Sequence, residues 1–406
     1  MASRLLHLGR EGARFVADWA YLVAVTAGSL FRRRRREGDI RSILVLCTAG
    51  IGDALWSTPV LRALRARHPD AAIAVLVSQK RGTRQVFEGS PFVDECIVVD
   101  WDYRALPGGL ARFLRLLRGR SFDMTVFTFP GAGIGSRLLA HLIGAPVRAG
   151  YKGFGSRFLL TLAVPLDARQ HSLKINLDLA SAVGAAIEDA RLDLPIDEGD
   201  RAYAEELTRK NGDMLGEALV GVHPGGFPDI PEKAWPSERF AQVIDALQEN
   251  AGVRVLLFGG PQDDERVGRI LSSLKGGPPL LATGLTLRQM AALFQECRVL
   301  ITNDCGPLRV AEAVGTPAIA LFGPTDPALV GPYEAWAGRY IVIRKQIPCG
   351  PCYHRKRIRC PYDAKCMDLI TAEEVVNAAR VFLESRGGPD ANDSKRPSGE
   401  GQHAKV

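Results

Sequence analysis

Short runs of β-branched and aliphatic residues alternate with longer amphipathic runs from about residue 40 onward. The first apolar run, Ser42–Leu46, is continuous rather than alternating, which is typical of a strand buried on both faces of a parallel sheet. The next segment, Pro59–His68, places apolar residues at helical spacing and has proline in its first turn. The same patterns predict further strands at Ala72–Ser78, Glu95–Asp100 and Met124–Phe129, and a helix at Gly109–Leu117. This βαβα order predicts an open, mostly parallel sheet with helices on both faces.

The alternation restarts in the second half of the chain. Strands are predicted at Leu219–His223, Val253–Phe258, Arg298–Thr302 and Ala318–Phe322, and helices at Glu238–Glu249 and Leu308–Val314. Each of these strands is followed within two residues by Gly, Pro or Asp, at the sheet edge where parallel sheets usually carry ligand-binding loops. The sequence therefore predicts two doubly wound α/β domains. We place their boundary in the polar segment Pro195–Gly199, which gives domains 39–197 and 198–386.

Length and composition fit two globular domains. A chain of 406 residues exceeds the usual size of one domain, and 46% hydrophobic with 24% charged residues is typical of a soluble protein. The formal net charge is +7, but residues 1–41 hold nine Arg and four acidic residues and carry +5 of it, which leaves +2 for the rest. Because the net charge of the chain after residue 41 is so small, the sequence argues against nucleic-acid binding. The tail 387–406 is poor in apolar residues and is predicted to be disordered.

The N-terminal segment 1–38 combines an apolar run with a block of arginines. The run Phe15–Phe31 is interrupted by Asp18 and is followed at once by Arg32–Arg36. Because a membrane-spanning helix needs about 20 apolar residues, we expect this run to lie in the membrane interface with the arginines on anionic lipid. A single-pass anchor and an ordinary helix packed on the protein are the alternatives. The basic block follows the apolar run, which disfavours a signal peptide and favours a cytoplasmic protein.

The first chemically distinctive loop reads CTAGIGDALWSTP over Cys47–Pro59 and joins the first strand to a helix. Gly50 and Gly52 allow the backbone to approach a ligand or a facing domain closely. Asp53 is either a cap of the helix or a general base aimed at an acceptor hydroxyl. The loop lacks the third glycine of a dinucleotide fingerprint and has no Walker A lysine, so a dehydrogenase or a kinase is disfavoured.

A second loop of this kind is Asn303–Pro307, between a predicted strand and a predicted helix. Backbone N–H groups around Gly306 and Pro307, at the helix start, suit an anion such as a diphosphate leaving group. Asp304 fits a cap that orders the turn better than a phosphate contact, because two anions repel. Arg309 either adds positive charge to the phosphate site or is a solvated surface residue.

Two further turns in the second half carry polar residues of the right type. The sequence His223-Pro224-Gly225-Gly226 precedes Lys233, which is either a phosphate contact or a solvated loop lysine. After the turn at Gly259-Gly260 come three acids, of which Asp263 is suited to a ribose hydroxyl. Acids at this position are also simply favoured at a helix start.

Taken in their order, these segments resemble glycosyltransferase family 9, the ADP-heptose:lipopolysaccharide heptosyltransferases. The resemblance covers roughly residues 41–385 and is carried by GIGDALWSTPVLRAL, VHPGG…KAWPSERFAQVI, FGGPQDDE and NDCGPLRVAEAVGTPAIALFGPTDP. It implies two Rossmann-like domains in the GT-B arrangement, facing a central cleft, and inverting transfer with no metal or other cofactor required for catalysis. It also implies ADP-heptose as donor, a lipid-linked glycan of the lipopolysaccharide core as acceptor, and work at the cytoplasmic face of the inner membrane.

The resemblance also assigns roles to particular residues. Asp53 matches the family's general base and Lys233 its phosphate-contacting lysine. Gly306 and Pro307 match its diphosphate-binding turn, and Asp263 is the best match to its ribose-contacting acid. The chain departs from the family in two places, since many members carry Ser or Thr at Cys305 and His at Arg309.

Other functions stay open on this evidence. A GT-B enzyme that uses another nucleotide sugar or acceptor is one alternative. A membrane-attached sugar-nucleotide-binding protein without catalysis is another, although the presence of both Asp53 and Lys233 argues against it. A Rossmann oxidoreductase is disfavoured by the missing fingerprint.

Four of the eight cysteines crowd into one basic segment. They are Cys349, Cys352, Cys360 and Cys366. Four thiolates can hold zinc or iron tetrahedrally, which makes a structural metal site one interpretation, and related family members often carry similar cysteines here. Free thiols and a disulfide pair are the alternatives. A catalytic metal is disfavoured because a four-cysteine site leaves no open coordination position.

Overall fold

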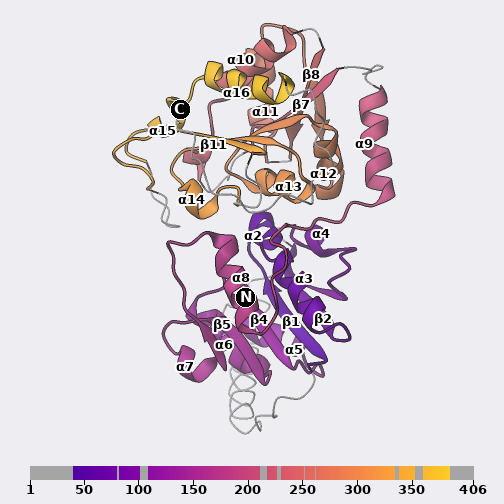
Figure 1. Cartoon of the computed structure of the whole chain (residues 1–406), viewed down its shortest axis with the longest axis vertical. Coiled ribbons are helices and arrows are strands. Elements are labelled where there is room, and N and C mark those ends of the chain that lie inside the picture. The colour runs from indigo at the N-terminus through magenta and orange to yellow at the C-terminus, as the bar shows by residue number, and fades with distance from the viewer. Residues whose placement is uncertain are drawn as a thin grey trace, which may run out of the picture.

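The structure, a computed structural model, describes residues 40–384 apart from 80–81, 101–107, 211–216, 226–229, 251, 261, 334–337 and 353–359. The predicted membrane-associating segment 1–38 and the predicted tail 387–406 therefore lie outside the described residues. No helix within the described part of the chain is long and apolar enough to cross a bilayer. The chain folds into two α/β domains that lie end to end, one above the other in Figure 1.

The N-terminal domain is built on a parallel sheet of six strands in the order β3-β2-β1-β4-β5-β6. Its strands are β1 (Ser42–Cys47), β2 (Ala72–Ser78), β3 (Glu95–Val99), β4 (Met124–Phe127), β5 (Val147–Tyr151) and β6 (Leu162–Val164). Its helices are α2 (Ile51–Leu55), α3 (Thr58–Arg67), α4 (Arg84–Phe87), α5 (Gly108–Leu116), α6 (Ile134–Ile143), α7 (Ser156–Leu159) and α8 (Ser172–Ala182).

The C-terminal domain has a second parallel sheet of six strands in the order β12-β11-β10-β7-β8-β9. Its strands are β7 (Ala218–His223), β8 (Val253–Gly259), β9 (Leu280–Thr283), β10 (Val299–Asn303), β11 (Ala318–Phe322) and β12 (Tyr340–Arg344). Its helical elements are α9 (Glu198–Lys210), the short 3-10 turn Pro231–Lys233, α10 (Ser237–Gln248), α11 (Asp264–Ser273), α12 (Leu287–Glu296), α13 (Gly306–Val314), α14 (Pro327–Val330), α15 (Lys365–Asp368) and α16 (Ala372–Glu384).

The two sheets share one topology. Renumbered within its own domain, the second order becomes 3-2-1-4-5-6 when it is read from β9, which is the order of the first sheet and of doubly wound dinucleotide-binding folds. The prediction of two Rossmann-like α/β domains is therefore confirmed. In such sheets the ligand crevice lies beyond the carboxyl ends of the two central strands, here β1 with β4 and β7 with β10.

The faces of each sheet are covered by different helices because side chains alternate along a strand. On β1, Ile43 and Val45 join the apolar cluster that includes α3 and α8, whereas Leu44 and Leu46 join the cluster beneath α5 and α6. In the C-terminal domain α10 and α16 cover one face, and α12 and α13 lie in the cluster on the other. All strands near the domain centres are buried on both sides, as their continuous apolar sequences predict.

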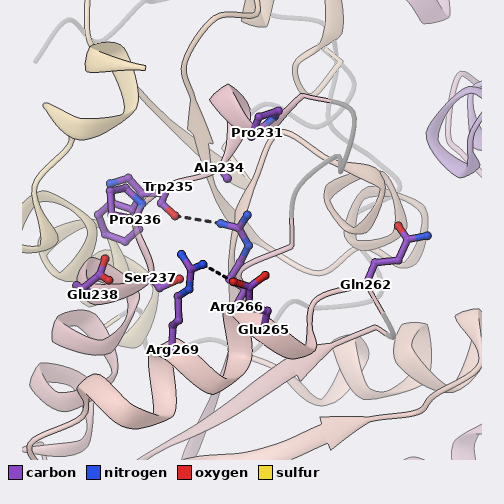
Figure 2. A pocket seen from close by; sticks show the side chains of 10 residues that line it. All are labelled: Pro231, Ala234, Trp235, Pro236, Ser237, Glu238, Gln262, Glu265, Arg266 and Arg269. Carbon is purple, nitrogen blue, oxygen red and sulfur yellow. Dashed lines mark hydrogen bonds and ion pairs between the residues drawn. The ribbon is translucent and has the colours of Figure 1, made fainter. Parts of the chain in front are cut away.

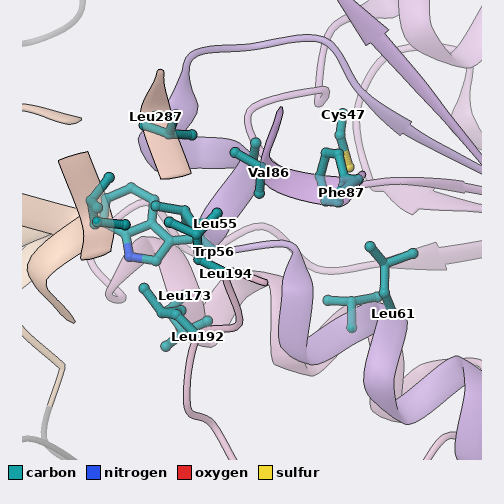
Figure 3. Close-up of a cluster of buried hydrophobic side chains, with 14 of the residues drawn as sticks. Cys47, Leu55, Trp56, Leu61, Val86, Phe87, Leu173, Leu192, Leu194 and Leu287 are labelled. Atoms are coloured by element: carbon teal, nitrogen blue, oxygen red, sulfur yellow. The ribbon is translucent and has the colours of Figure 1, made fainter. Parts of the chain in front are cut away.

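One apolar cluster runs without a break from the first domain into the second. Figure 3 shows Leu55 of α2, Trp56 just after it and Val86 of α4 beside Leu287, which belongs to α12 of the C-terminal domain. A hydrogen bond also joins the two domains here: the side-chain oxygen of Gln85 accepts the backbone N–H of Leu287 at 2.7 Å. The two domains therefore share a packed interface.

Candidate active site

Asp53 lies in the first turn of α2, at the crevice of the N-terminal domain. A cavity of about 80 Å³ is lined by Asp53, by the end of β1 and by the loop Thr128–Gly131 that follows β4. The helix N-cap is Gly50, with no side-chain cap bond, so the alternative that Asp53 is the cap is wrong. The half-buried carboxylate is instead part of the cavity wall.

A buried amide holds the two walls of this cavity together. Asn176, on α8, is fully buried, and its side-chain oxygen accepts the backbone N–H of Phe129 at 2.7 Å and the hydroxyl of Tyr151 at 3.0 Å. Its side-chain nitrogen donates to the carbonyl of Trp56, just after α2, at 3.3 Å. Loss of any of these hydrogen bonds would leave a buried polar group unpaired, so Asn176 fixes the Phe129 loop relative to α2.

On the opposite side, a second buried amide gathers the loops of the C-terminal domain. Asn303 ends β10, and its side-chain nitrogen donates to the carbonyls of Pro224 and Gly225, both at 3.0 Å. Its side-chain oxygen accepts the backbone N–H of Trp235 at 3.3 Å. The turn after β7 and the loop carrying Lys233 are thereby tied to the turn that begins α13.

Lys233 and Asp304 form a buried ion pair. Their charged atoms lie 2.6 Å apart, with side chains only 8% and 9% exposed, so the alternative of a solvated lysine is wrong. Asp304 also accepts the hydroxyl of Thr325, which follows β11, at 2.8 Å. The N-cap of α13 is Cys305 and not Asp304. Asp304 therefore orders this region by holding a lysine and a threonine from two other loops.

The remaining predicted donor-side residues surround this pair. Gly306 and Pro307 form the first turn of α13, which begins two residues earlier than predicted. Burial raises the pKa of the Cys305 thiol to about 11, so it is neutral near pH 7. Asp263 accepts the backbone N–H of Gly260 at 3.0 Å, and a Cβ placed on Gly225 would lie 3.1 Å from its carboxylate. Gly226 lies outside the described residues.

The two sets of loops meet where α2 touches α13. A Cβ placed on Gly52 would lie 3.1 Å from the side chain of Arg309, and one placed on Gly306 would lie 3.8 Å from Cβ of Ile51. Gly52 thus permits the close approach of a facing domain, as its sequence context predicts. Asp53 follows Gly52 directly in α2, so it lies close to this contact between the domains.

Arg309 is placed differently from both predicted alternatives. It is 2% exposed, and its guanidinium pairs with the buried Glu312 and donates to the carbonyls of Val330 and Gly331. The same group lies 5.3 Å from the ring centre of Trp56, across the domain interface. The polar partners of Arg309 belong to its own domain and its guanidinium packs on Trp56 of the other, so the structure places this arginine in the domain interface.

His171 adds a second link across the interface. Its Nε2–H donates to the carbonyl of Gly331 at 2.9 Å, while its Nδ1 accepts the backbone N–H of Leu173 at 3.1 Å. The ring contacts Trp56 edge-on and packs beside Tyr333. Burial, and less strongly the charge of Arg309, lower the pKa of His171 to about 4, although the Gly331 carbonyl acts in the opposite direction. The neutral ring is therefore the form that the interface requires.

A larger cavity of about 290 Å³ lies beside the donor-side loops, between the starts of α10 and α11 (Figure 2). It is bordered by Trp235 and by Gln262, the residue before Asp263. Arg266 reaches across it to the carbonyl of Trp235 at 3.5 Å. Burial lowers the pKa of this guanidinium, with the Asp263 charge opposing.

The prediction of a structural metal is not supported. In the part of the chain that the structure describes, which includes all four clustered cysteines, no group of three or more His, Cys, Asp or Glu side chains is arranged to hold a metal ion. The cysteines range from exposed Cys349 to buried Cys366, whose sulfur packs beside Gly323. The backbone N–H of Cys352 bonds to the carbonyl of Pro324, so the segment lies close to the Thr325 loop.

Two doubly wound, Rossmann-like domains packed against each other form the GT-B arrangement of glycosyltransferases. Comparison with protein families matches residues 110–362 to glycosyltransferase family 9 (heptosyltransferase). The lipopolysaccharide heptosyltransferase 2 of Salmonella typhimurium is 30% identical over 305 residues, which cover 71% of this chain and 85% of that protein. This chain belongs to glycosyltransferase family 9, and it is a glycosyltransferase.

Solved structures agree with this assignment. The family 9 glycosyl transferase of Veillonella parvula has a TM-score of 0.74 at 31% identity and covers 86% of this chain and 99% of its own. The Escherichia coli ADP-heptose lipopolysaccharide heptosyltransferase II has a TM-score of 0.66 at 25% identity, over 84% of this chain and 98% of its own. The resemblance predicted from the sequence motifs is therefore confirmed at the level of family and fold.

The His171 contact predicts how stability depends on pH. The unfolded chain protonates His171 below about pH 6.5, but the folded chain resists protonation down to about pH 4. Between these values the unfolded state binds more protons, so stability falls with falling pH, by up to about 3 kcal/mol from this group. Urea denaturation followed by circular dichroism at pH 7, 6, 5 and 4 measures the decline.

The control is the variant His171→Gln, which does not titrate in this range. His68, His141 and His223 contribute equally to both proteins, so the difference between the two pH profiles isolates His171. We expect a shallower decline in the variant between pH 6.5 and 4. Parallel profiles would contradict the proton linkage of this interface.

Proposed function

We propose that this enzyme transfers a heptose from ADP-heptose to a lipid-linked acceptor of the lipopolysaccharide core. The observation that supports it most directly is that Asp53, which lines a cavity in one domain, and the start of α13 beside the buried Lys233–Asp304 pair in the other both lie near the contact between α2 and α13. The names of the relatives supply the substrate class: lipopolysaccharide heptosyltransferase 2 and ADP-heptose lipopolysaccharide heptosyltransferase II. Both domains of this chain are covered by those relatives.

The proposed chemistry is an inverting displacement with Asp53 as general base. The acceptor hydroxyl gives its proton to the Asp53 carboxylate while its oxygen attacks the anomeric carbon from the face opposite the diphosphate. The new glycosidic C–O bond forms as the bond to the diphosphate oxygen breaks, and ADP leaves with the electron pair. A positioned general base contributes about 10²–10⁴-fold to the rate of such a step. No metal or other cofactor is required in this scheme.

The donor diphosphate is proposed to lie against the N-terminal turn of α13. Backbone N–H groups at Gly306 and the positive end of the helix favour an anion there. Lys233 adds a cation at the same place, and Asp304 keeps it in position. Asp263, held beside Gly225 by its bond to Gly260, is the proposed ribose contact. Gly50 and Gly52, on the other side, leave room for the acceptor and for the facing domain.

Membrane association of the N-terminal segment is part of this proposal, because the acceptor is lipid-linked. Residues 1–38 lie outside the described residues, and the support is their apolar run followed by five consecutive arginines. The expected location is the cytoplasmic face of the inner membrane. Deletion of residues 1–36 should shift the protein from the membrane fraction to the soluble fraction, and an unchanged distribution would contradict the role of this segment.

Replacement of the proposed base gives the sharpest test of the mechanism. Asp53→Asn keeps the size of the side chain but cannot accept the acceptor proton, so turnover with ADP-heptose should fall by about 10²–10⁴-fold. Donor binding should stay nearly intact, because Asp53 belongs to the opposite domain. Turnover is measured by ADP release and binding by calorimetry with ADP.

The matched control is Asp70→Asn, which removes an exposed carboxylate in the turn between α3 and β2. This variant should retain full turnover. Unchanged turnover in Asp53→Asn would remove Asp53 from the mechanism, whereas loss of ADP binding in that variant would indicate a structural role.

The substrate assignment is tested in cells by deleting the gene in the organism that encodes it. Mass spectrometry of its lipopolysaccharide should then show a core that lacks a heptose and everything attached beyond it. A core truncated at a different sugar would identify another donor. An unchanged lipopolysaccharide, together with no donor turnover in vitro, would favour a binding protein without catalysis.

A further inference from the structure

Large apolar side chains gather in the open on one side of the N-terminal domain. Phe154 is 84% exposed and Phe158 80%, and both belong to α7 or to the turn before it. Ile134 and Leu138, one turn apart on α6, are 51% and 37% exposed. These four residues form what we call the α6–α7 face, which lies at the lower left of Figure 1. Single exposed apolar residues are ordinary, but a contiguous group of large ones marks an interaction surface.

A buried arginine holds this face in its exposed arrangement. Arg137 lies between Ile134 and Leu138 on α6 and is 6% exposed. Its guanidinium donates to the carbonyls of Ala132, Tyr151 and Phe154 at 2.6, 3.3 and 3.0 Å. The turn that carries Phe154 is therefore held against α6 by the hydrogen bonds of Arg137 and is not folded onto the domain core.

Gly153, the residue before Phe154, packs directly against the side chain of Arg137. A Cβ placed on Gly153 would lie 2.7 Å from the guanidinium of Arg137, closer than atoms can approach. The backbone then turns through Gly155, which has a φ of 77° and begins α7. Both glycines keep Phe154 and Phe158 directed away from the domain core, so the exposure is built into the fold.

The stretch of chain that contains this face carries charge of a single sign. No acidic residue occurs between Asp123 and Asp167, whereas this stretch contains Arg137, Arg148, Lys152 and Arg157. Lys152 and Arg157 are exposed, and neither forms an ion pair with a carboxylate of the described residues. Basic residues just beyond the stretch are paired, as in Lys174 with Asp178. Exposed phenyl rings flanked by unpaired cations fit the surface of a bilayer that contains anionic lipid.

The α6–α7 face also adjoins the proposed acceptor cavity. Ser136, on α6 between Ile134 and Leu138, lines the cavity that contains Asp53. One helix therefore connects the cavity wall to the exposed apolar face. A lipid-linked glycan rising from a bilayer beneath this face would have a short route to Asp53.

We propose that the α6–α7 face docks on a bilayer surface containing anionic lipid. Phe154 and Phe158 enter the headgroup region, and Lys152 and Arg157 contact lipid phosphates. This contact lies in the folded domain and is separate from the N-terminal segment. It rests on the proposed function only in that the acceptor is lipid-linked, since docking itself needs neither donor nor acceptor.

Hydrogen–deuterium exchange of the full-length protein gives a local readout of this docking. Peptides that cover residues 152–160 should exchange more slowly when vesicles of phosphatidylethanolamine and phosphatidylglycerol are added, and less so with phosphatidylcholine vesicles. Peptides from α16, where Val381 is an exposed apolar residue of similar character, should not change. Raised salt should reduce the protection, because it screens the contribution of Lys152 and Arg157.

The double variant Phe154→Ser, Phe158→Ser removes the apolar part of the face without touching the core. The vesicle concentration needed for half-maximal protection of residues 152–160 should rise at least about tenfold, since each phenyl ring loses its burial among the headgroups. The control is Val381→Ser, which should behave like the unaltered protein. Circular dichroism verifies that both variants fold.

Three outcomes would overturn the proposal. The first is unchanged exchange of residues 152–160 while the protein still floats with vesicles, which would leave the N-terminal segment as the only contact. The second is equal behaviour of the double variant and the unaltered protein. The third is protection that rises with protein concentration in the absence of vesicles, which would identify a second copy of the chain as the occupant. None of these outcomes bears on donor turnover, which is measured separately.

Discussion

The contact between α2 and α13 is the constraint on which the site depends. A Cβ on Gly52 would lie 3.1 Å from the side chain of Arg309, so even alanine would force a small shift there, and the guanidinium of Arg309 lies against Trp56 of the other domain. Glu312 and two backbone carbonyls of its own domain satisfy this charge, so moving the domains apart would leave these bonds in place but would remove the Trp56 contact and expose the buried pair to water. Because Asp53 and Gly306 belong to the same two helix starts, this contact also sets how far the proposed base lies from the donor.

The sequence was sufficient to predict the fold and most of the loops. Continuous apolar runs such as Ser42–Cys47 identify the central strands, because burial on both faces leaves little choice of residue. The strands that continuous apolar runs do not reveal lie toward the edges of the two sheets. Strand β5 contains Arg148 and Gly150, and β6 and β9 have only three and four residues, so their apolar runs are interrupted or short. Edge strands carry a weaker burial signal for this reason. Strand β12 is half-buried but does contain the apolar run Ile341–Ile343, so its sequence was sufficient to predict it.

The site was predicted less completely than the fold, and the missing parts share a cause. Asn176, Thr325 and His171 act through contacts with residues far away in the chain, and nothing in their local sequence marks such a contact. Arg309 illustrates the same limit, since its position in a helix start suggests a phosphate or solvent, whereas its partners come from other loops and the other domain. Thr325 could have been suspected, because it follows a buried strand at the same sheet edge as Asp304. The domain boundaries and the roles of the individual site residues stay predictions.

If Lys233 contacts the donor diphosphate as proposed, its burial together with Asp304 has a consequence for how the catalytic cycle ends. A lone buried lysine would hold a departing nucleoside diphosphate strongly, since release would leave its charge without a partner in a poorly solvated place. Asp304 lies 2.6 Å from Lys233 and neutralises its charge without any ligand group. The arrangement thus gives up some affinity for the spent nucleotide and in exchange lowers the barrier to its escape, which favours turnover over product retention.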